Sequence, residues 1–288
     1  MSFLRFLILS ALVCAASACA ATEAASEIGG AEPPWIKNAV AVDDVDESAP
    51  KIALVIDDLG VSRKMTRRVI ALPAPLTASF LSYADDLPAQ TELARLAGHE
   101  LLVHMPMEPV DPRFDAGPDA LKTDMTPDEI RENLSVMLDS FSGYVGVNNH
   151  MGSKFTSVET DMRVVMDEIN RRGLLFLDSL TSGRSTAAGV AEQTGTPFAV
   201  RNVFLDNARN EADIMRQLSL LERHARRHGF AVGIGHPHKA TVDALGKWIP
   251  AAKKRGVVFV PVSAVALYLQ NADKAAHTRA LNRHDESE

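Results

Sequence analysis

Cysteine is nearly absent from this chain of 288 residues, because Cys14 and Cys19 are its only two and both lie close to the amino terminus. Residues 21–288 therefore offer no thiol for a disulfide, a catalytic thiolate or a zinc–cysteine site. They also lack a stripe of basic residues, which leaves no electrostatic case for binding nucleic acid. Stability must come from packing.

The first residues have the composition of a secretory signal. Arg5 precedes an apolar run at 6–13, and small residues follow at 15–18, which is the layout of a signal peptide. The run is too short for a membrane span. We expect residues 1–20 to be removed on export to the periplasm or cell envelope, which leaves no transmembrane span. The alternative is a lipid anchor on Cys19.

Charge distinguishes the next segment from the rest of the chain. Seven acidic residues against Lys37 in residues 21–50 account for most of the formal net charge of −7. We expect residues 21–50 to be a disordered linker rich in acids and alanine. Residues 51–270 are expected to form one folded domain, and residues 271–288 a polar tail.

Short apolar runs alternate with segments of helical spacing in the predicted domain. Helices are predicted from Thr126, at 158–172 and at 211–228, with glycine after the last two. Such alternation predicts a mostly parallel sheet with helices on its outside. The predicted strands are 51–56, 76–81, 100–105, 144–148, 174–179, 199–205, 230–235 and 257–262.

We expect this sheet to close into an irregular (β/α)7-type barrel of mostly parallel strands, in the α/β class. An open doubly wound sheet is the alternative. The glycine-rich dinucleotide fingerprint of that fold is missing after the first strand, where the sequence reads Asp57-Asp58-Leu59-Gly60.

Polar residues follow the predicted strands at their carboxyl ends, which converge on one mouth in such folds. This set is the candidate functional site. Its members are Asp57 and Asp58 at the end of the first strand, His104 and Glu108 on the third, Asn148, Asn149 and His150 on the fourth, Asp178 and Ser179 on the fifth, Asp206 and Asn207 on the sixth, and His236 and His238 on the seventh.

Asp57 and Asp58 are adjacent carboxylates behind an apolar strand. Both stay ionised there only if a cation or strong hydrogen-bond donors lie beside them. A divalent metal would satisfy this need, with one carboxylate as its ligand and the other as general base. Alternatively, the pair only forms a turn into a helix capped at Ser62.

His104 and His150 are the candidate imidazole ligands. Two histidines and one carboxylate leave one position of a zinc-like ion open for water. Taken singly, each histidine is better explained as a hydrogen-bonded structural residue, so the metal hypothesis depends on their occurrence together with the aspartate pair.

His236 and His238 stand in a proline-stiffened loop, and one of them can point inward. A histidine there could protonate a leaving group, whereas the alternative is a surface loop. Asp178 and Asp206 could orient a ligand or the base, or could cap helices. Arg201 could bind an anionic group of the substrate or the reaction's oxyanion.

A family resemblance rests on motifs at these strand ends. IDDLG (56–60), HMPMEP (104–109), GVNNHMGS (146–153), FLDS (176–179) and GIGHPH (233–238) resemble the divergent polysaccharide deacetylase family over residues 51–270. The resemblance implies an irregular (β/α)7 barrel related to the carbohydrate deacetylases, which use a metal ion and water to remove N-acetyl or O-acetyl groups.

The resemblance also implies roles for single residues. Asp57 matches the general base, Asp58 and His150 match metal ligands, and His236 matches the general acid. The well-characterised enzymes carry an H-x-x-x-H motif, whereas here two asparagines precede a lone His150. His104 is therefore expected to supply the second imidazole.

The leading hypothesis is a metal-dependent deacetylase, with zinc as the expected ion and an acetylated poly- or oligosaccharide of the cell envelope as substrate. The well-characterised enzymes also carry an Arg-x-Pro-Tyr segment that has no clear counterpart here. For that reason the alternative is a catalytically inactive barrel that binds envelope glycan or a protein partner.

Overall fold

The computed structural model describes residues 31–42, 46 and 48–272. The predicted signal peptide and most of the predicted polar tail lie outside these residues. The sheet and its helices belong to a compact unit that begins at Pro34.

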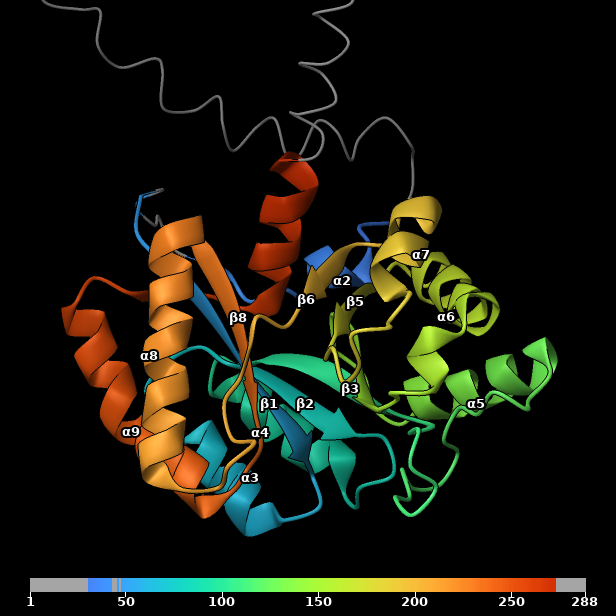
Figure 1. Cartoon of the computed structure of the whole chain (residues 1–288), viewed down its shortest axis with the longest axis horizontal. Helices are drawn as coiled ribbons and strands as arrows, with labels where there is room; N and C mark the ends of the chain where they lie inside the picture. The colour runs from blue at the N-terminus through green and yellow to red at the C-terminus, as the bar shows by residue number, and fades with distance from the viewer. Residues whose placement is uncertain (1–30, 43–45, 47, 273–288) are drawn as a thin grey trace, which may run out of the picture. The chain divides into compact units, whose positions relative to one another are not determined.

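A parallel sheet forms the centre of this unit (Figure 1). Its order is β6-β5-β4-β3-β2-β1-β8-β7, and β9 also pairs with β1. The strands are β1 (Lys51–Leu59), β2 (Thr77–Leu81), β3 (Glu100–Met107), β4 (Gly146–Met151), β5 (Leu175–Asp178), β6 (Phe198–Val200), β7 (Val203–Phe204), β8 (Phe230–Gly235) and β9 (Val258–Phe259).

The two ends of the sheet are consecutive in the chain. Only Arg201 and Asn202 separate β6 from β7, so the two end strands lie within about 11 Å of each other. The predicted strand 199–205 is thus two strands at opposite ends of the sheet order, joined by this short crossing. The sheet curls into a barrel with its seam here, and the predicted irregular (β/α)7-type barrel of mostly parallel strands is confirmed.

Helices cover the outside of the sheet (Figure 1). They are α3 (Arg63–Ile70), α4 (Leu87–Leu96), α5 (Pro127–Leu138), α6 (Glu159–Arg171), α7 (Ala187–Thr194), α8 (Glu211–His228) and α9 (Lys239–Lys254), with a 3-10 turn η1 (Phe155–Ser157) before α6. In α5 the predicted cap is present, because Thr126 Oγ1 accepts from Glu129 N and the Glu129 carboxylate accepts from Thr126 N. Within the described residues, no helix is long and apolar enough to cross a membrane.

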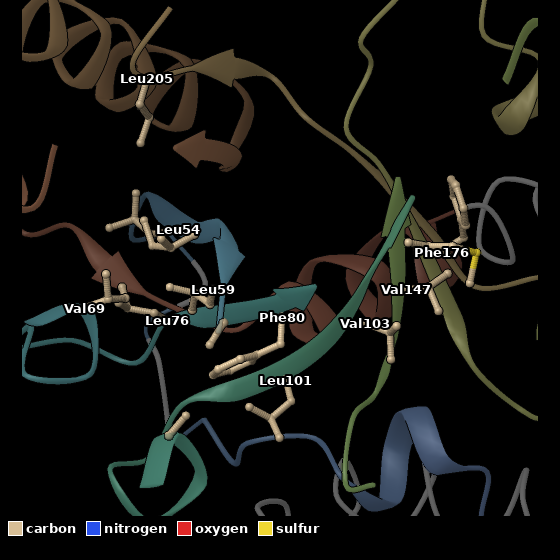
Figure 2. Packing of buried hydrophobic residues seen from close by; sticks show 14 of the residues in the cluster. Leu54, Leu59, Val69, Leu76, Phe80, Leu101, Val103, Val147, Phe176 and Leu205 are labelled. Atoms are coloured by element: carbon tan, nitrogen blue, oxygen red, sulfur yellow. The ribbon is translucent and has the colours of Figure 1, made fainter. Parts of the chain in front are cut away.

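Alternation along the strands sorts their side chains into two cores. The outer cluster lies between the strands and the helices, and Figure 2 shows it at successive strands through Leu54, Phe80, Val103, Val147 and Phe176. The inner cluster fills the barrel. Its strand residues are Ala53, Val55, Leu102, Leu175, Leu177, Ala199, Val232 and Ile234, and Val145, just before β4, joins them.

Two segments fill the amino end of the barrel. Trp35, in α2 (Pro34–Lys37), and Val265, in the helical segment 262–272, both belong to the inner cluster. The backbone N–H of Trp35 donates to the carbonyl of Gly173, just before β5. This part of the segment 21–50 is folded, which differs from the expected linker, because one buried indole anchors it.

Gly146 opens β4 at a point where Leu175 on β5 lies very close to its Cα. A Cβ at this position would overlap the carbonyl oxygen of Leu175 on β5 and would lie 2.7 Å from the Leu175 Cγ. Because backbone atoms cannot move aside without breaking the strand pair, only glycine fits here.

Gly146→Ala is therefore expected to lower the free energy of unfolding by about 1–3 kcal/mol or more. Gly189→Ala is the matched control, since a Cβ at this exposed position in α7 would meet nothing within 4 Å. The control should be neutral or slightly stabilising. Denaturant unfolding measures both, and equal stabilities for the two variants would contradict the packing argument.

Glu100 is a buried carboxyl at the amino end of β3. Its Oε1 accepts from Ser263 N at 3.1 Å and from Thr77 Oγ1 at 3.3 Å, and its Oε2 accepts from the Ser263 hydroxyl. Burial raises the pKa of Glu100 from 4.5 to about 7, although these donors act in the opposite direction. The folded protein therefore holds a proton that the unfolded chain releases at lower pH.

Stability should fall as the pH rises from 4.5 to about 7, because only the unfolded chain loses this proton in that range. The fall attributable to Glu100 is about 3 kcal/mol. Glu100→Gln should remove this fall, whereas Glu192→Gln on the exposed face of α7 should retain it. Denaturant unfolding at pH 4.5 and pH 8 compares the three proteins, and parallel pH profiles for all of them would refute the prediction.

Candidate active site

An irregularity in β1 turns both predicted aspartates to the mouth of the barrel. Strict alternation would place Asp57 inward and Asp58 outward. The register of β1 against β2 shifts between Ile56 and Leu59, and Asp58 has a φ of 55°. Such a bulge with a left-handed residue re-aims a side chain. As a result, Asp58 Oδ1 and Asp57 Oδ2 lie 3.3 and 3.7 Å from His104 Nε2.

Asp58, His104 and His150 converge at this mouth, and we call them the Asp–His–His cluster. Asp58 Oδ1 lies 2.9 Å from His150 Nδ1 and 3.3 Å from His104 Nε2. The two imidazole nitrogens are 3.1 Å apart. Three atoms from β1, β3 and β4 thus form one small triangle.

This triangle fits a metal ion. Asp58 Oδ1 is buried and makes no hydrogen bond of acceptable geometry within the described residues, although two nitrogens lie beside it. Nitrogen and oxygen ligands of one tetrahedral zinc ion, each at about 2.1 Å, are about 3.4 Å apart. Two imidazoles and a carboxylate are a donor set that suits zinc and similar ions.

Asn148 organises the residues around this cluster, and the sequence reasoning assigned it no role. Its Oδ1 faces His104 Nδ1 at 3.0 Å and accepts from the Ser79 hydroxyl. Its Nδ2 donates to Asp57 Oδ1 at 2.9 Å and to Ser179 Oγ at 3.1 Å. Because an amide oxygen can only accept, His104 carries a proton on Nδ1, which leaves the Nε2 of a neutral ring free for a metal.

The buried charges shift one another's ionisation. Burial raises the pKa of Asp57, and the nearby His104 and His236 offset this only in part. Burial acts on Asp58 in the same sense, but the adjacent imidazoles of His104 and His150 outweigh it and hold the pKa of Asp58 well below its usual range. Asp58 is therefore an anion in the folded protein, whereas Asp57 has a raised affinity for a proton.

His236 follows β8 and faces the cluster from the other side of the mouth. Its Nδ1 lies 2.9 Å from Asp206 Oδ1, and its Nε2 lies 3.9 Å from Asp58 Oδ2. Burial would lower the pKa of His236, but Asp206, Asp57 and Asp58 together raise it to about 9. His236 is thus the inward residue of the two loop histidines, and Asp206 orients it.

The remaining candidates line or support a cleft of about 650 Å³ that opens above the cluster. Arg201 lies on its wall, where Nε and Nη2 donate to the carbonyls of Ser179 and Leu180. Asp178 accepts from Leu180 N at 2.7 Å, so it shapes the loop after β5. His238 lines the cleft farther from the cluster, with its ring 5.8 Å from that of His236.

Known structures share this fold. A deacetylase solved with substrate has the same fold at a TM-score of 0.50 and 16% identity, over 76% of this chain and 92% of that one. An uncharacterized protein from Agrobacterium tumefaciens C58 is much closer, with a TM-score of 0.78 and 32% identity over 81% of this chain and 95% of that one. The class defined by fold and strand-end residues is that of the deacetylase-like (β/α) barrels.

The chain belongs to the divergent polysaccharide deacetylase family, whose model matches residues 54–266. The uncharacterized protein YibQ of Escherichia coli (strain K12) is 39% identical over 204 residues, which are 70% of this chain and 63% of that protein. The chain therefore spans less than two thirds of this relative's length. The predicted family resemblance is confirmed.

Proposed function

We propose that this protein is a metal-dependent hydrolase that removes acetyl groups from an acetylated glycan, with zinc as the expected ion. The observation that carries the proposal is the Asp–His–His cluster, whose three ligand atoms lie within 3.3 Å of one another. One of them, Asp58 Oδ1, is buried and has no hydrogen bond of good geometry within the described residues. Membership of the deacetylase family supports an acetylated glycan as the substrate.

When bound at this cluster, a divalent ion would supply Lewis-acid chemistry that polarises an acetyl carbonyl and acidifies a nearby water. The protein prepares its ligands for that ion. Asn148 keeps the proton of a neutral His104 on Nδ1 and away from Nε2, and the low pKa of Asp58 keeps its carboxylate ionised. The left-handed backbone of Asp58 aims that carboxylate at both imidazoles.

Asp57 is the proposed general base. Its Oδ2 lies 3.7 Å from His104 Nε2, next to the ligand atoms, while its Oδ1 is held by Asn148. The affinity for protons that burial confers suits a carboxylate that must take a proton from water attacking the acetyl carbon. Asn148 thus orients Asp57 through one carboxylate oxygen, and the second oxygen faces the cluster.

His236 is the proposed general acid. Asp206 accepts a hydrogen bond from the Nδ1–H of His236. Because the pKa of His236 is raised to about 9, the second ring nitrogen faces the cleft with a proton available at neutral pH. This nitrogen can protonate the amine or alcohol that leaves when the acetyl bond breaks. The base and the acid thus stand on β1 and β8, which are neighbours in the sheet.

The proposal includes an exported location in the periplasm or cell envelope. Its support is the signal-like composition of residues 1–20, with a lipid anchor at Cys19 as the alternative to a soluble form.

Asp58→Asn should reduce the affinity for zinc by at least about 100-fold and should abolish acetate release, because a neutral amide replaces the charged ligand. Metal content after dialysis and acetate release from an N-acetylglucosamine oligomer are the measurements. Asp243→Asn is the control, since this surface aspartate pairs with Lys239 and Arg68 on the outside of the barrel. Equal zinc content in the wild type and Asp58→Asn would refute the ligand assignment. Wild-type protein that binds zinc and glycan but releases no acetate would favour the inactive barrel.

Asn148→Ala should weaken zinc binding by about 10- to 100-fold while the metal ligands remain in place. The reason is that His104 loses the acceptor that fixes its ring orientation and Asp57 loses its donor. Competition with a chelator measures the zinc affinity, and thermal unfolding checks that the variant folds. Asn133→Ala on α5 is the control for loss of an asparagine outside the cleft. An unchanged zinc affinity in folded Asn148→Ala would rule out the positioning role.

A further inference from the structure

Arg201 is a half-buried cation at the seam of the barrel, and its guanidinium forms no direct ion pair with a carboxylate of the described residues. Its Nε donates to Ser179 O at 2.6 Å and its Nη2 donates to Leu180 O at 2.7 Å. Within the described residues, no ion pair and no hydrogen bond from Nη1 accompany these contacts. The guanidinium is therefore held rigidly by backbone carbonyls while one of its nitrogens stays available on the cleft wall.

The lining of the cleft also includes an aromatic ring and a second cation. The guanidinium of Arg201 lies 5.2 Å from the centre of the Phe204 ring. The imidazole of His236 also contacts the Phe204 ring, and the two ring centres are 5.4 Å apart. Arg209 also lines the cleft, is exposed, and forms no ion pair or hydrogen bond in the part of the chain that the structure describes. The lining of the cleft thus includes two arginines without a direct ion pair in the described residues.

Within the described residues, no acidic side chain forms a direct ion pair with either arginine, although the charges of Asp178 and Asp57 act to raise the pKa of Arg201. Asp206 accepts hydrogen bonds from His236 and Thr241. Asp57 and Asp58 face the histidines and, in the proposed function, a divalent ion. Burial lowers the pKa of Arg201, and the charges of Asp178 and Asp57 offset this only in part. An anion on a bound ligand would supply the direct partner that this half-buried charge lacks.

We propose that the glycan bound in this cleft carries a carboxylate on a sugar next to the acetylated one, and that Arg201 binds this carboxylate with help from Arg209. The inference rests on the proposed function for the position of the acetyl group. A carboxylate fits better than a phosphate, because one rigid guanidinium edge and one exposed arginine match a single negative charge. Phe204 provides an apolar surface beside it for the sugar ring.

The test compares two ligands that differ only in charge. One is an oligosaccharide in which N-acetylglucosamine alternates with glucuronate, and the other is the same oligosaccharide with every carboxylate converted to a carboxamide. Calorimetry should show the wild type binding the carboxylate form about 10- to 100-fold more tightly. Equal affinities, or no measurable binding of either ligand, would overturn the proposal.

Three variants test whether Arg201 and Arg209 cause the preference for the carboxylate ligand. Arg201→Gln should abolish the preference, and Arg209→Gln should reduce it about 2- to 5-fold, with a difference that disappears at high salt. Arg223→Gln on the exposed face of α8 removes the same charge outside the cleft and should preserve the wild-type preference. If Arg201→Gln does not fold, Arg209→Glu provides the test at an exposed position, and an unchanged preference in that variant would count against the proposal.

Acetate release separates this proposal from the proposed function. A wild-type protein that prefers the carboxylate ligand but releases no acetate with zinc present would refute the deacetylase and leave the carboxylate site standing. Acetate release at equal rates from both ligands, together with equal affinities, would support the deacetylase and refute the carboxylate site.

Discussion

The alternation of inward and outward side chains along parallel strands is the constraint on which the site depends. In a curled sheet every inward position points at the same small volume, so the strands share one interior. Below the mouth these positions hold apolar residues such as Val55 and Ile234. At the mouth the same parity presents Asp57, His104 and Asn148. The site is thus a polar continuation of the inner core and is positioned by the same strands.

Asp58 is the residue at which this constraint is broken, and the break brings a second carboxylate to the mouth. A left-handed conformation is unfavourable for a residue with a Cβ, yet Asp58 adopts it beside a shift in register. Met151 and Leu180 have the same sign of φ at the ends of β4 and β5. These three residues therefore have unfavourable backbone conformations at or just beyond the ends of strands that line the cleft, as is common at functional sites.

The barrel fold and the aspartates and histidines at its mouth could be predicted from the sequence, because strand positions and the convergence of strand ends follow from local patterns. The crossing at Arg201 and Asn202 could not, since a continuous apolar run from 199 to 205 does not show where the chain leaves one strand for another. Asn148 precedes His150 by two residues, so alternation could have placed both on one face. Its partners come from β1, β2, β3 and the loop after β5, and no local pattern reveals such a set.

The packed interior of the barrel limits how small molecules can enter and leave the site. Trp35 and Val265 close one end, and the inner cluster occupies the space between them and Asp57. Among the described residues, nothing forms a channel through this packed layer, so the site opens to solvent only at the mouth of the barrel. Any small molecule that reaches Asp58 must depart by the route of its arrival, and a long ligand lying across the opening would trap it until that ligand shifts.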